Sequence, residues 1–311
     1  MKLALVFPGQ GSQSVGMMAG YESFPVVRET FAEASSALGQ DLWALVSEGP
    51  DEALNQTVNT QPAMLAADIA VYRAWQAAGG AQASILAGHS LGEYAALVAA
   101  GTLAFSDALP LVHFRARAMQ EAVPAGVGAM AAVMGLDEAG IAEACREAAQ
   151  GQVVEPVNFN APGQIVIAGH REAVERAIAV AKTKGAKRAL MLPVSAPFHS
   201  QLLRPAAERL AAYLAKVPVA AATAPVLHNV DVRAATSPDA IRSALAAQAA
   251  SPVRWIETIQ SFAAQGVTHI VECGPGKVLT SLCKRIAPEI ETLPLNDGDA
   301  IAVAITSTRA G

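Results

Sequence analysis

The sequence predicts an α/β protein in which a large domain, built on a mostly parallel sheet, carries a small inserted subdomain. Short apolar runs alternate with longer segments that begin and end on helix-capping residues, a pattern typical of a parallel sheet covered by helices. Residues 127–194 follow a different order: strand, helix, strand, strand, helix, strand. This βαββαβ order is ferredoxin-like. The large domain is therefore expected at residues 1–126 and 195–311.

The first part of the large domain gives clear element boundaries. Residues 2–7 and 84–88 are short apolar runs and predict buried strands. The first helix is expected to follow Ser23 as its N-cap, to carry Pro25 in its first turn and to stop at Gly39. Further helices are expected at 60–78 and 91–100, and at 106–122 with Ser106 as the cap.

The remaining elements follow the same reasoning. In the inserted segment, strands are expected at 129–135, 153–160, 164–169 and 187–194, and helices at 137–149 and 171–185. Beyond it, the pattern predicts helices at about 199–215, 237–249 and 252–265, a strand at 267–272, a helix after 274–277 and a short strand at 292–295.

Composition excludes several protein classes. With 52% hydrophobic and 16% charged residues the chain is not disordered, and a net charge of −5 argues against nucleic acid as the main ligand. Cys145, Cys273 and Cys283 form no C-x-x-C pair, so neither a disulfide framework nor a metal site is expected. No apolar run approaches the roughly 18 residues of a membrane span, and the first run is too short for a signal-peptide core. A soluble cytoplasmic protein without membrane contact is expected.

The strongest chemical signal is the sequence Gly-His-Ser-Leu-Gly at 88–92. It is a G-x-S-x-G pattern, with an apolar strand before it and a helix after it. That context predicts a nucleophile elbow, a tight turn that exposes the oxygen of Ser90 at the N-terminus of a helix. The large domain is therefore expected to be hydrolase-like.

A serine nucleophile needs a base, and six histidines are candidates. His89 neighbours Ser90 in the chain, so its side chain should point elsewhere. His113 lies on a predicted helix and His269 in a predicted strand, and both are read more simply as structural. His199 lies in a loop where the chain returns to the large domain, a place that favours a cleft. A structural role for His199 stays open at this point.

Three other features have both a structural and a functional interpretation. The loop at 8–13 could hold phosphate or lend a backbone N–H to an oxyanion, or be an ordinary turn; it matches neither nucleotide fingerprint. Arg115 lies in an apolar helix and needs an anionic partner, either an internal acid or a ligand. The basic residues Lys182, Lys184, Lys187 and Arg188 could form a solvated helix end or a dock for an acidic partner.

Taken together, the motifs resemble those of the malonyl-CoA:acyl carrier protein transacylases, and of the related acyltransferase domains of polyketide synthases. The resemblance covers nearly the whole chain in order. It is carried by FPGQGSQ at 7–13, TQPA at 60–63, GHSLGEYAAL at 88–97, RARAMQEAVP at 115–124, VNFNAPGQIVIAG at 157–169, FHS at 198–200 and ECGPGKVL at 272–279.

The resemblance implies roles for the catalytic residues. Ser90 would be the nucleophile that becomes malonylated, and His199 its base. The main-chain carbonyl of Gln248 would orient the histidine in place of an acid. The backbone N–H groups of Gln10 and Leu91 would form the oxyanion hole. No metal or other cofactor is implied, and the kinetics would be ping-pong through a malonyl-serine.

The resemblance also implies how the substrates are held. Arg115 would bind the free carboxylate of the malonyl group, which its planar guanidinium suits. With an acidic acyl carrier protein as the partner, the basic stretch described above would dock it through Lys187 and Arg188. Leu91 and Phe198 are typical of malonyl selectors. Positions lining the acyl and pantetheine pocket would be Gln61, Met119, Asn160, Phe198 and Val278.

Two other classes of function stay open on the sequence. A serine hydrolase would want an acid between Ser90 and His199 in the chain, which Asp137 or Glu155 could supply. A patatin-like lipase would use an Asp-Gly pair, for which Asp297 is the candidate. A catalytically silent module that binds carrier protein is the alternative from outside the enzymes. Within the resemblance, a free-standing polyketide acyltransferase is the alternative to fatty acid biosynthesis.

Overall fold

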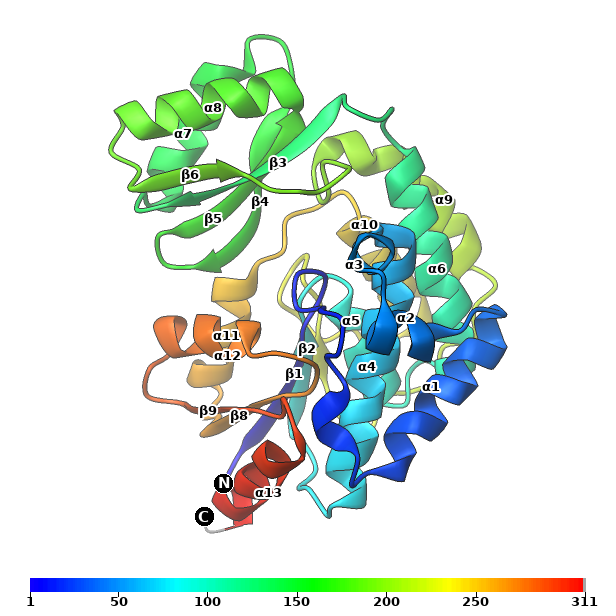
Figure 1. Ribbon diagram of the computed structural model, residues 1–311. Coiled ribbons are helices and arrows are strands. Elements are labelled where there is room, and N and C mark those ends of the chain that lie inside the picture. Colours follow the sequence, from blue (N-terminus) through cyan, green and yellow to red (C-terminus); the bar gives the residue numbers. More distant parts are fainter. Residues whose placement is uncertain (310–311) are drawn as a thin grey trace.

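The computed structural model describes residues 1–309 and confirms the predicted α/β class (Figure 1). The large sheet has five strands in the order β7-β2-β1-β8-β9, and every neighbouring pair is parallel. Its strands are β1 (Leu3–Phe7), β2 (Ile85–Gly88), β7 (Val226–Leu227), β8 (His269–Glu272) and β9 (Glu291–Pro294).

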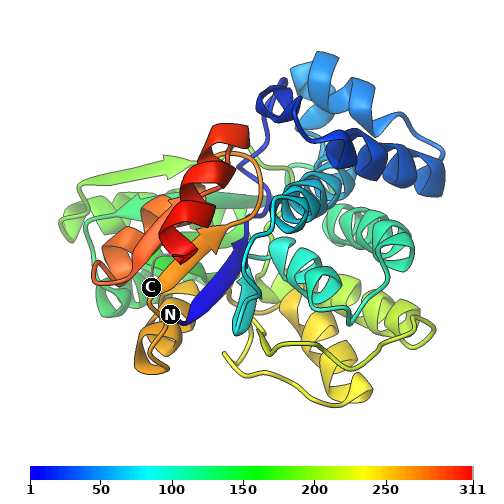
Figure 2. The same cartoon turned by 90° about the horizontal axis from the view of Figure 1, so that it is seen from below.

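Helices cover this sheet on both faces, as the continuous apolar strands require (Figure 2). Alternate side chains of β1 point to opposite faces. Leu3, Leu5 and Phe7 enter the larger core. That core is built mainly from α1 (Pro25–Leu38), α4 (Thr57–Ala77), α5 (Gly92–Ala99), α6 (Phe105–Glu121), α9 (Arg204–Leu214) and α10 (Pro238–Gln248). Ala4 and Val6 enter a second core with α11 (Trp255–Ala264) and α12 (Val278–Ile286).

The small subdomain lies at the top of Figure 1 and has the predicted βαββαβ order. Its antiparallel sheet runs β4-β5-β3-β6. The elements are β3 (Gly128–Met134), α7 (Glu138–Ala149), β4 (Val154–Ala161), β5 (Gln164–His170), α8 (Arg171–Thr183) and β6 (Arg188–Met191). The two helices cover one face. From the other face Met130, Val166 and Ala168 join the core of the large domain. We retain residues 127–194 as the proposed bounds of this subdomain.

Backbone contacts join the two parts next to the predicted site. The Val253 N–H donates to the carbonyl of Val157 over 2.8 Å, and the Phe159 N–H donates to the carbonyl of Val253 over 3.0 Å. Pro197 packs so tightly on Gly128 that a Cβ there would lie 2.3 Å from the proline ring. The subdomain is thereby held at the segment that carries His199.

Several elements differ from the predictions. Helix α1 has Phe24 rather than Ser23 as its N-cap, and α6 begins at Phe105 rather than after a Ser106 cap. Pro62 lies inside α4, which starts three residues earlier than expected. The expected helix at 199–215 is a 3₁₀ turn, η2 (Gln201–Leu203), followed by α9.

Other elements were not predicted at all. They are η1 (Ala19–Tyr21), α2 (Leu42–Glu48), α3 (Asp51–Leu54), α13 (Gly298–Arg309) and the two-residue β7. Local capping explains two of them. The side chain of Asp41 accepts a hydrogen bond from the Ala44 N–H, and that of Asp297 accepts one from the Ala300 N–H. Within residues 1–309, no helix has the length and apolar character needed to span a bilayer.

Candidate active site

Ser90 lies on a sharp turn between β2 and α5, held by close backbone contacts. A Cβ at Gly88 would come within 1.9 Å of the Gly92 carbonyl carbon, and one at Gly92 within 2.0 Å of the Phe7 carbonyl oxygen. Ser90 itself has φ of +52°, a left-handed conformation that is costly for a side-chain-bearing residue. The strand–turn–helix of a nucleophile elbow is therefore present, and it depends on both glycines.

Ser90 and His199 form a hydrogen-bonded pair. Ser90 Oγ lies 2.7 Å from His199 Nε2, and His199 Nδ1 lies 2.8 Å from the main-chain carbonyl of Gln248. Because a carbonyl only accepts, Nδ1 carries the proton and Nε2 is free to accept from the serine. Burial, followed by the nearby charge of Arg115, lowers the pKa of His199 to about 3. The imidazole is therefore a neutral base at physiological pH.

Two backbone N–H groups are available beside Ser90. Gly9, the residue before Gln10, packs against the elbow so closely that a Cβ there would lie 2.5 Å from the His89 carbonyl oxygen and 3.6 Å from the Leu91 backbone nitrogen. Within residues 1–309, neither of these two N–H groups donates a hydrogen bond to the protein. The Ser90 N–H, in contrast, donates to Asn229 Oδ1 over 2.8 Å. Gln10 and Leu91 are thus the free donors at this place.

Arg115 is fully buried, with an exposed fraction of 1%, and its guanidinium reaches Ser90. Its Nη1 donates to Gln61 Oε1 over 2.6 Å, and its Nη2 donates to Gln248 Oε1 over 2.8 Å and to Ser90 Oγ over 3.2 Å. None of the ion pairs within residues 1–309 includes Arg115. The guanidinium is therefore held by neutral amides and not by the internal acid that one interpretation of the sequence required.

These groups face a small cavity of about 110 Å³. It is far below the roughly 300–1,000 Å³ of pockets for drug-sized ligands, so it suits a short acyl group. Its lining includes the predicted residues Gln10, Gln61, Ser90, Leu91, Arg115, Met119, Phe198 and His199, and also His89, Met130, Asn158, Leu192 and Val194, which were not predicted to line it. A larger hollow between α6 and α9 contains none of the predicted site residues.

Two of the predicted pocket residues lie outside this cavity. The Oδ1 of Asn160 instead accepts a hydrogen bond from His89 Nε2 over 2.8 Å, and its place in the lining is taken by Asn158, two residues earlier on β4. The β4 strand is irregular here, so the alternation of its side chains could not be read from the sequence. Val278 is the first residue of α12 and is 45% exposed. A contact of Val278 with pantetheine stays a prediction.

The acids considered for a hydrolase have other partners. The side chain of Asp137 accepts from the Gly140 N–H at the start of α7, and Glu155 accepts from the Gln201 N–H. Asp297 caps α13. In a catalytic triad an acid accepts the hydrogen bond from the histidine Nδ1. Here the main-chain carbonyl of Gln248 accepts it from His199. Within the described residues, no cluster of three or more His, Cys, Asp or Glu could hold a metal.

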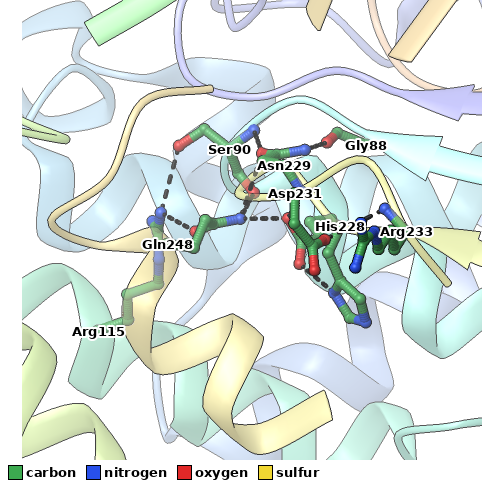
Figure 3. Close-up of polar contacts among 9 residues, drawn as sticks. Gly88, Ser90, Arg115, His228, Asn229, Asp231, Arg233 and Gln248 are labelled. Atoms are coloured by element: carbon green, nitrogen blue, oxygen red, sulfur yellow. Dashed lines mark hydrogen bonds and ion pairs between the residues drawn. The ribbon is translucent and has the colours of Figure 1, made fainter. Parts of the chain in front are cut away.

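A buried polar cluster that was not predicted lies beneath the elbow (Figure 3). Glu93 Oε1 accepts from His228 Nδ1 over 2.7 Å, and Glu93 Oε2 accepts from the Asn229 N–H over 2.9 Å. Asn229 Nδ2 donates to the Gly88 carbonyl over 2.7 Å. Glu93, three residues after the nucleophile in an otherwise apolar helix, was the one available signal, because a buried charge requires partners.

The proposed docking residues are exposed on the small subdomain. Lys187 precedes β6 and Arg188 is its first residue. Lys187 lines a hollow together with Arg285 of α12, so basic groups of the two parts of the molecule meet there. Lys184, in contrast, is paired with Glu143 and Glu147 of α7 at 3.2 and 2.7 Å. Part of the basic stretch is therefore neutralised within the subdomain.

The sequence is similar to those of known proteins. Residues 4–296 match the model of the acyl transferase domain family. The chain is 59% identical over 305 residues to the malonyl CoA-acyl carrier protein transacylase of Escherichia coli K12, covering 98% of this chain and 99% of the relative. It is 44% identical over 310 residues to the Bacillus subtilis protein of the same name, covering 99% and 98%.

Solved structures agree with these relatives. The acyl-carrier-protein S-malonyltransferase of Burkholderia pseudomallei superposes with a TM-score of 0.97 at 58% identity, covering 98% of this chain and 100% of that one. A malonyl-transacylase in complex with a type II polyketide synthase acyl-carrier protein superposes with a TM-score of 0.97 at 53% identity, covering 99% and 100%.

Proposed function

The chain belongs to the acyl transferase family, and we propose that it moves the malonyl group of malonyl-CoA to the phosphopantetheine thiol of acyl carrier protein, in fatty acid biosynthesis. One observation carries the choice of acyl group: a buried Arg115 points at Ser90 without a carboxylate partner among residues 1–309. A buried guanidinium held by neutral groups, the amides of Gln61 and Gln248 and the hydroxyl of Ser90, suits a ligand that brings its own negative charge. The names of the relatives agree with this choice.

In the first half-reaction Ser90 Oγ attacks the thioester carbonyl while His199 Nε2 takes the hydroxyl proton. The N–H groups of Gln10 and Leu91 hold the oxyanion of the tetrahedral intermediate. The carbon–sulfur bond then breaks, and the proton on His199 passes to the departing CoA thiolate. The products are malonyl-Ser90 and free CoA, with His199 neutral again.

The second half-reaction runs the same steps in reverse. The pantetheine thiol of the carrier protein gives its proton to His199 and attacks the malonyl-serine carbonyl. The same oxyanion donors serve this second tetrahedral intermediate. The serine oxygen leaves, takes the proton back from His199, and malonyl-carrier protein is released. One site serves the acyl donor and then the acyl acceptor, and CoA leaves before the carrier reacts, so the kinetics are ping-pong.

Lys187 and Arg188 form part of the surface that docks the acidic carrier. Both are exposed, and neither takes part in the ion pairs of residues 1–309. We place the reaction in the cytoplasm, because Cys145, Cys273 and Cys283 are all free thiols, as in a reducing compartment. A polyketide carrier is the second candidate acceptor, since one close structural relative was solved with such a partner.

The test is the intact mass of the purified protein after incubation with malonyl-CoA. We expect the mass to rise by one malonyl group, and the rise to disappear in Ser90→Ala, whose thermal unfolding is measured as a control for folding. Adding holo-acyl carrier protein should return the enzyme to its original mass and produce malonyl-carrier. Release of free malonate instead would identify a hydrolase. No mass change in the folded wild-type protein would identify a silent binding module.

Competition between fatty-acid and polyketide carriers for the malonyl-enzyme then decides the pathway.

A further inference from the structure

Gln248 connects three parts of the site through its main chain and its side chain. Its main-chain carbonyl accepts from His199, its Oε1 accepts from Arg115, and its Nε2 donates to the Ser90 carbonyl over 2.9 Å. The residue is completely buried, at 0% exposure, so water does not replace any of these partners. Gln248 therefore does more than orient the histidine through its backbone.

The orientation of the Gln248 amide is decided by its partners. The guanidinium of Arg115 can only donate, and the carbonyl of Ser90 can only accept, so the oxygen must face Arg115 and the NH₂ group must face Ser90. An amide turned by 180° would set two NH₂ hydrogens against the guanidinium and leave both buried groups unpaired, which is costly. Arg115 thus depends on one of two possible amide orientations.

Glu93 secures that orientation from the opposite side. Its Oε2 accepts from Gln248 Nε2 over 2.8 Å, and it is itself fully buried and held by His228 and the Asn229 N–H. A carboxylate offers only acceptors, so it favours the NH₂ end of the amide. Its charge also acts on Arg115, where it raises the guanidinium pKa against the larger lowering caused by burial.

We propose that Glu93 is a positioning residue for malonyl recognition, which acts through the Gln248 amide to present Arg115 to the substrate carboxylate. The negative charge of Glu93 acts on Arg115 without direct contact between the two side chains. A neutral amide lies between it and Arg115, so the guanidinium stays free to bind the substrate. A carboxylate in direct contact with Arg115 would compete with the malonyl group. This inference rests on the proposed malonyl transfer.

The experiment compares the rates at which malonyl-CoA and acetyl-CoA acylate Ser90, measured by intact mass. Glu93→Met keeps the length of the side chain and removes both acceptors, and we expect the malonyl-to-acetyl ratio of kcat/KM to fall at least tenfold. Glu93→Gln keeps one acceptor, and in this variant the malonyl-to-acetyl ratio should fall less, by about threefold to fivefold. If Glu93→Met does not fold, Glu93→Gln alone decides, because a ratio within twofold of wild type overturns the proposal.

A double-mutant cycle tests the path through Gln248. Gln248→Met should lower the same ratio, and adding Glu93→Met to it should lower the ratio no further. If the two substitutions together lower the ratio by the product of their separate effects, the proposal that Glu93 acts through Gln248 is overturned. The matched control is Glu272→Gln, which alters another fully buried carboxylate, held by the Leu279 and Thr280 N–H groups. It should reduce thermal stability and leave the ratio unchanged. A wild-type enzyme that is not malonylated would contradict the proposed function instead.

Discussion

Two sets of positive charges in this protein lie in opposite environments. Arg115 is buried in the lining of the cavity beside Ser90, and its guanidinium donates to the amide oxygens of Gln61 and Gln248. Lys187 and Arg188 lie in solvent on the small subdomain, where water and salt surround them. The buried charge acts at short range in a low dielectric, while the exposed charges are screened over about 8–10 Å.

The difference separates two kinds of recognition. A buried guanidinium can discriminate between acyl groups, because a substrate without a carboxylate leaves it poorly compensated. Exposed charges contribute little to any single contact and act mainly on the encounter with an oppositely charged partner. Changes at the two places should therefore affect different half-reactions and by different amounts.

Replacing Arg115 should have the larger effect. Arg115→Ala removes a charge-assisted bidentate contact of about 1.5–3 kcal/mol, so kcat/KM for malonyl-CoA should fall roughly tenfold to somewhat over a hundredfold. Acetyl-CoA, which has no carboxylate, should be affected far less. Arg115→Lys should recover only part of the loss, because a point charge does not reproduce the planar fork. The measurement is kcat/KM for both substrates together with thermal unfolding.

An equal loss of kcat/KM for both substrates, together with a lower melting temperature, would contradict the proposed contact between Arg115 and the malonyl carboxylate. That combination would mean that Arg115 is needed chiefly for folding, since its amide partners Gln61 and Gln248 would be left without a donor.

How far the sequence predicts this site depends on the range of the interactions. The elbow at Ser90 was predictable, because its glycines, strand and helix are consecutive in the chain. The fold class followed from the alternation of short apolar runs with helices. The capping acids Asp41 and Asp297 were also local signals, and they mark helices that were overlooked.

The cluster beneath the elbow was not predictable in the same way. Glu93 meets His228 and Asn229 across 135 and 136 residues of chain, and no local pattern records such a pairing. Likewise, the exchange of Asn160 for Asn158 at the cavity follows from irregular pairing in β4, which moves side chains between faces. The pantetheine contact of Val278 followed from the family resemblance alone and stays a prediction.

Charge reversal on the exposed side should give the next largest effect. Lys187→Glu with Arg188→Glu should raise KM for acyl carrier protein several-fold and hardly change malonylation by malonyl-CoA, because the acidic partner meets only the second half-reaction. Salt should weaken the wild-type carrier interaction in the same direction. The check is the KM for carrier at two ionic strengths, with the rate of enzyme malonylation measured in parallel.

A matched control for the reversal is Lys184→Glu. Lys184 is already paired with Glu143 and Glu147, so its loss should disturb α7 and α8 more than docking. Equal losses in both half-reactions of the double reversal would show a disturbed fold and would contradict a docking role for Lys187 and Arg188.

The smallest expected effect is that of pH on acylation, and it follows from the buried side of the comparison. Burial and the charge of Arg115 lower the pKa of His199 to about 3. The base therefore stays neutral on acidification, and kcat/KM for acylation by malonyl-CoA should change less than about twofold between pH 7.5 and 5. A histidine of ordinary pKa near 6.5 would lose roughly thirtyfold over that range, and such a loss would contradict the buried-base assignment.

The same shift has a consequence for stability with a definite sign. Between about pH 6.5 and pH 3 the unfolded chain protonates this histidine while the folded protein does not, so the unfolded state binds more protons. Stability should therefore fall as the pH is lowered through this window. His199→Gln lacks this contribution, and its melting temperature should fall less between pH 6.5 and 5 than that of the wild type. Equal falls in both proteins would mean that His199 titrates alike in the folded and unfolded states.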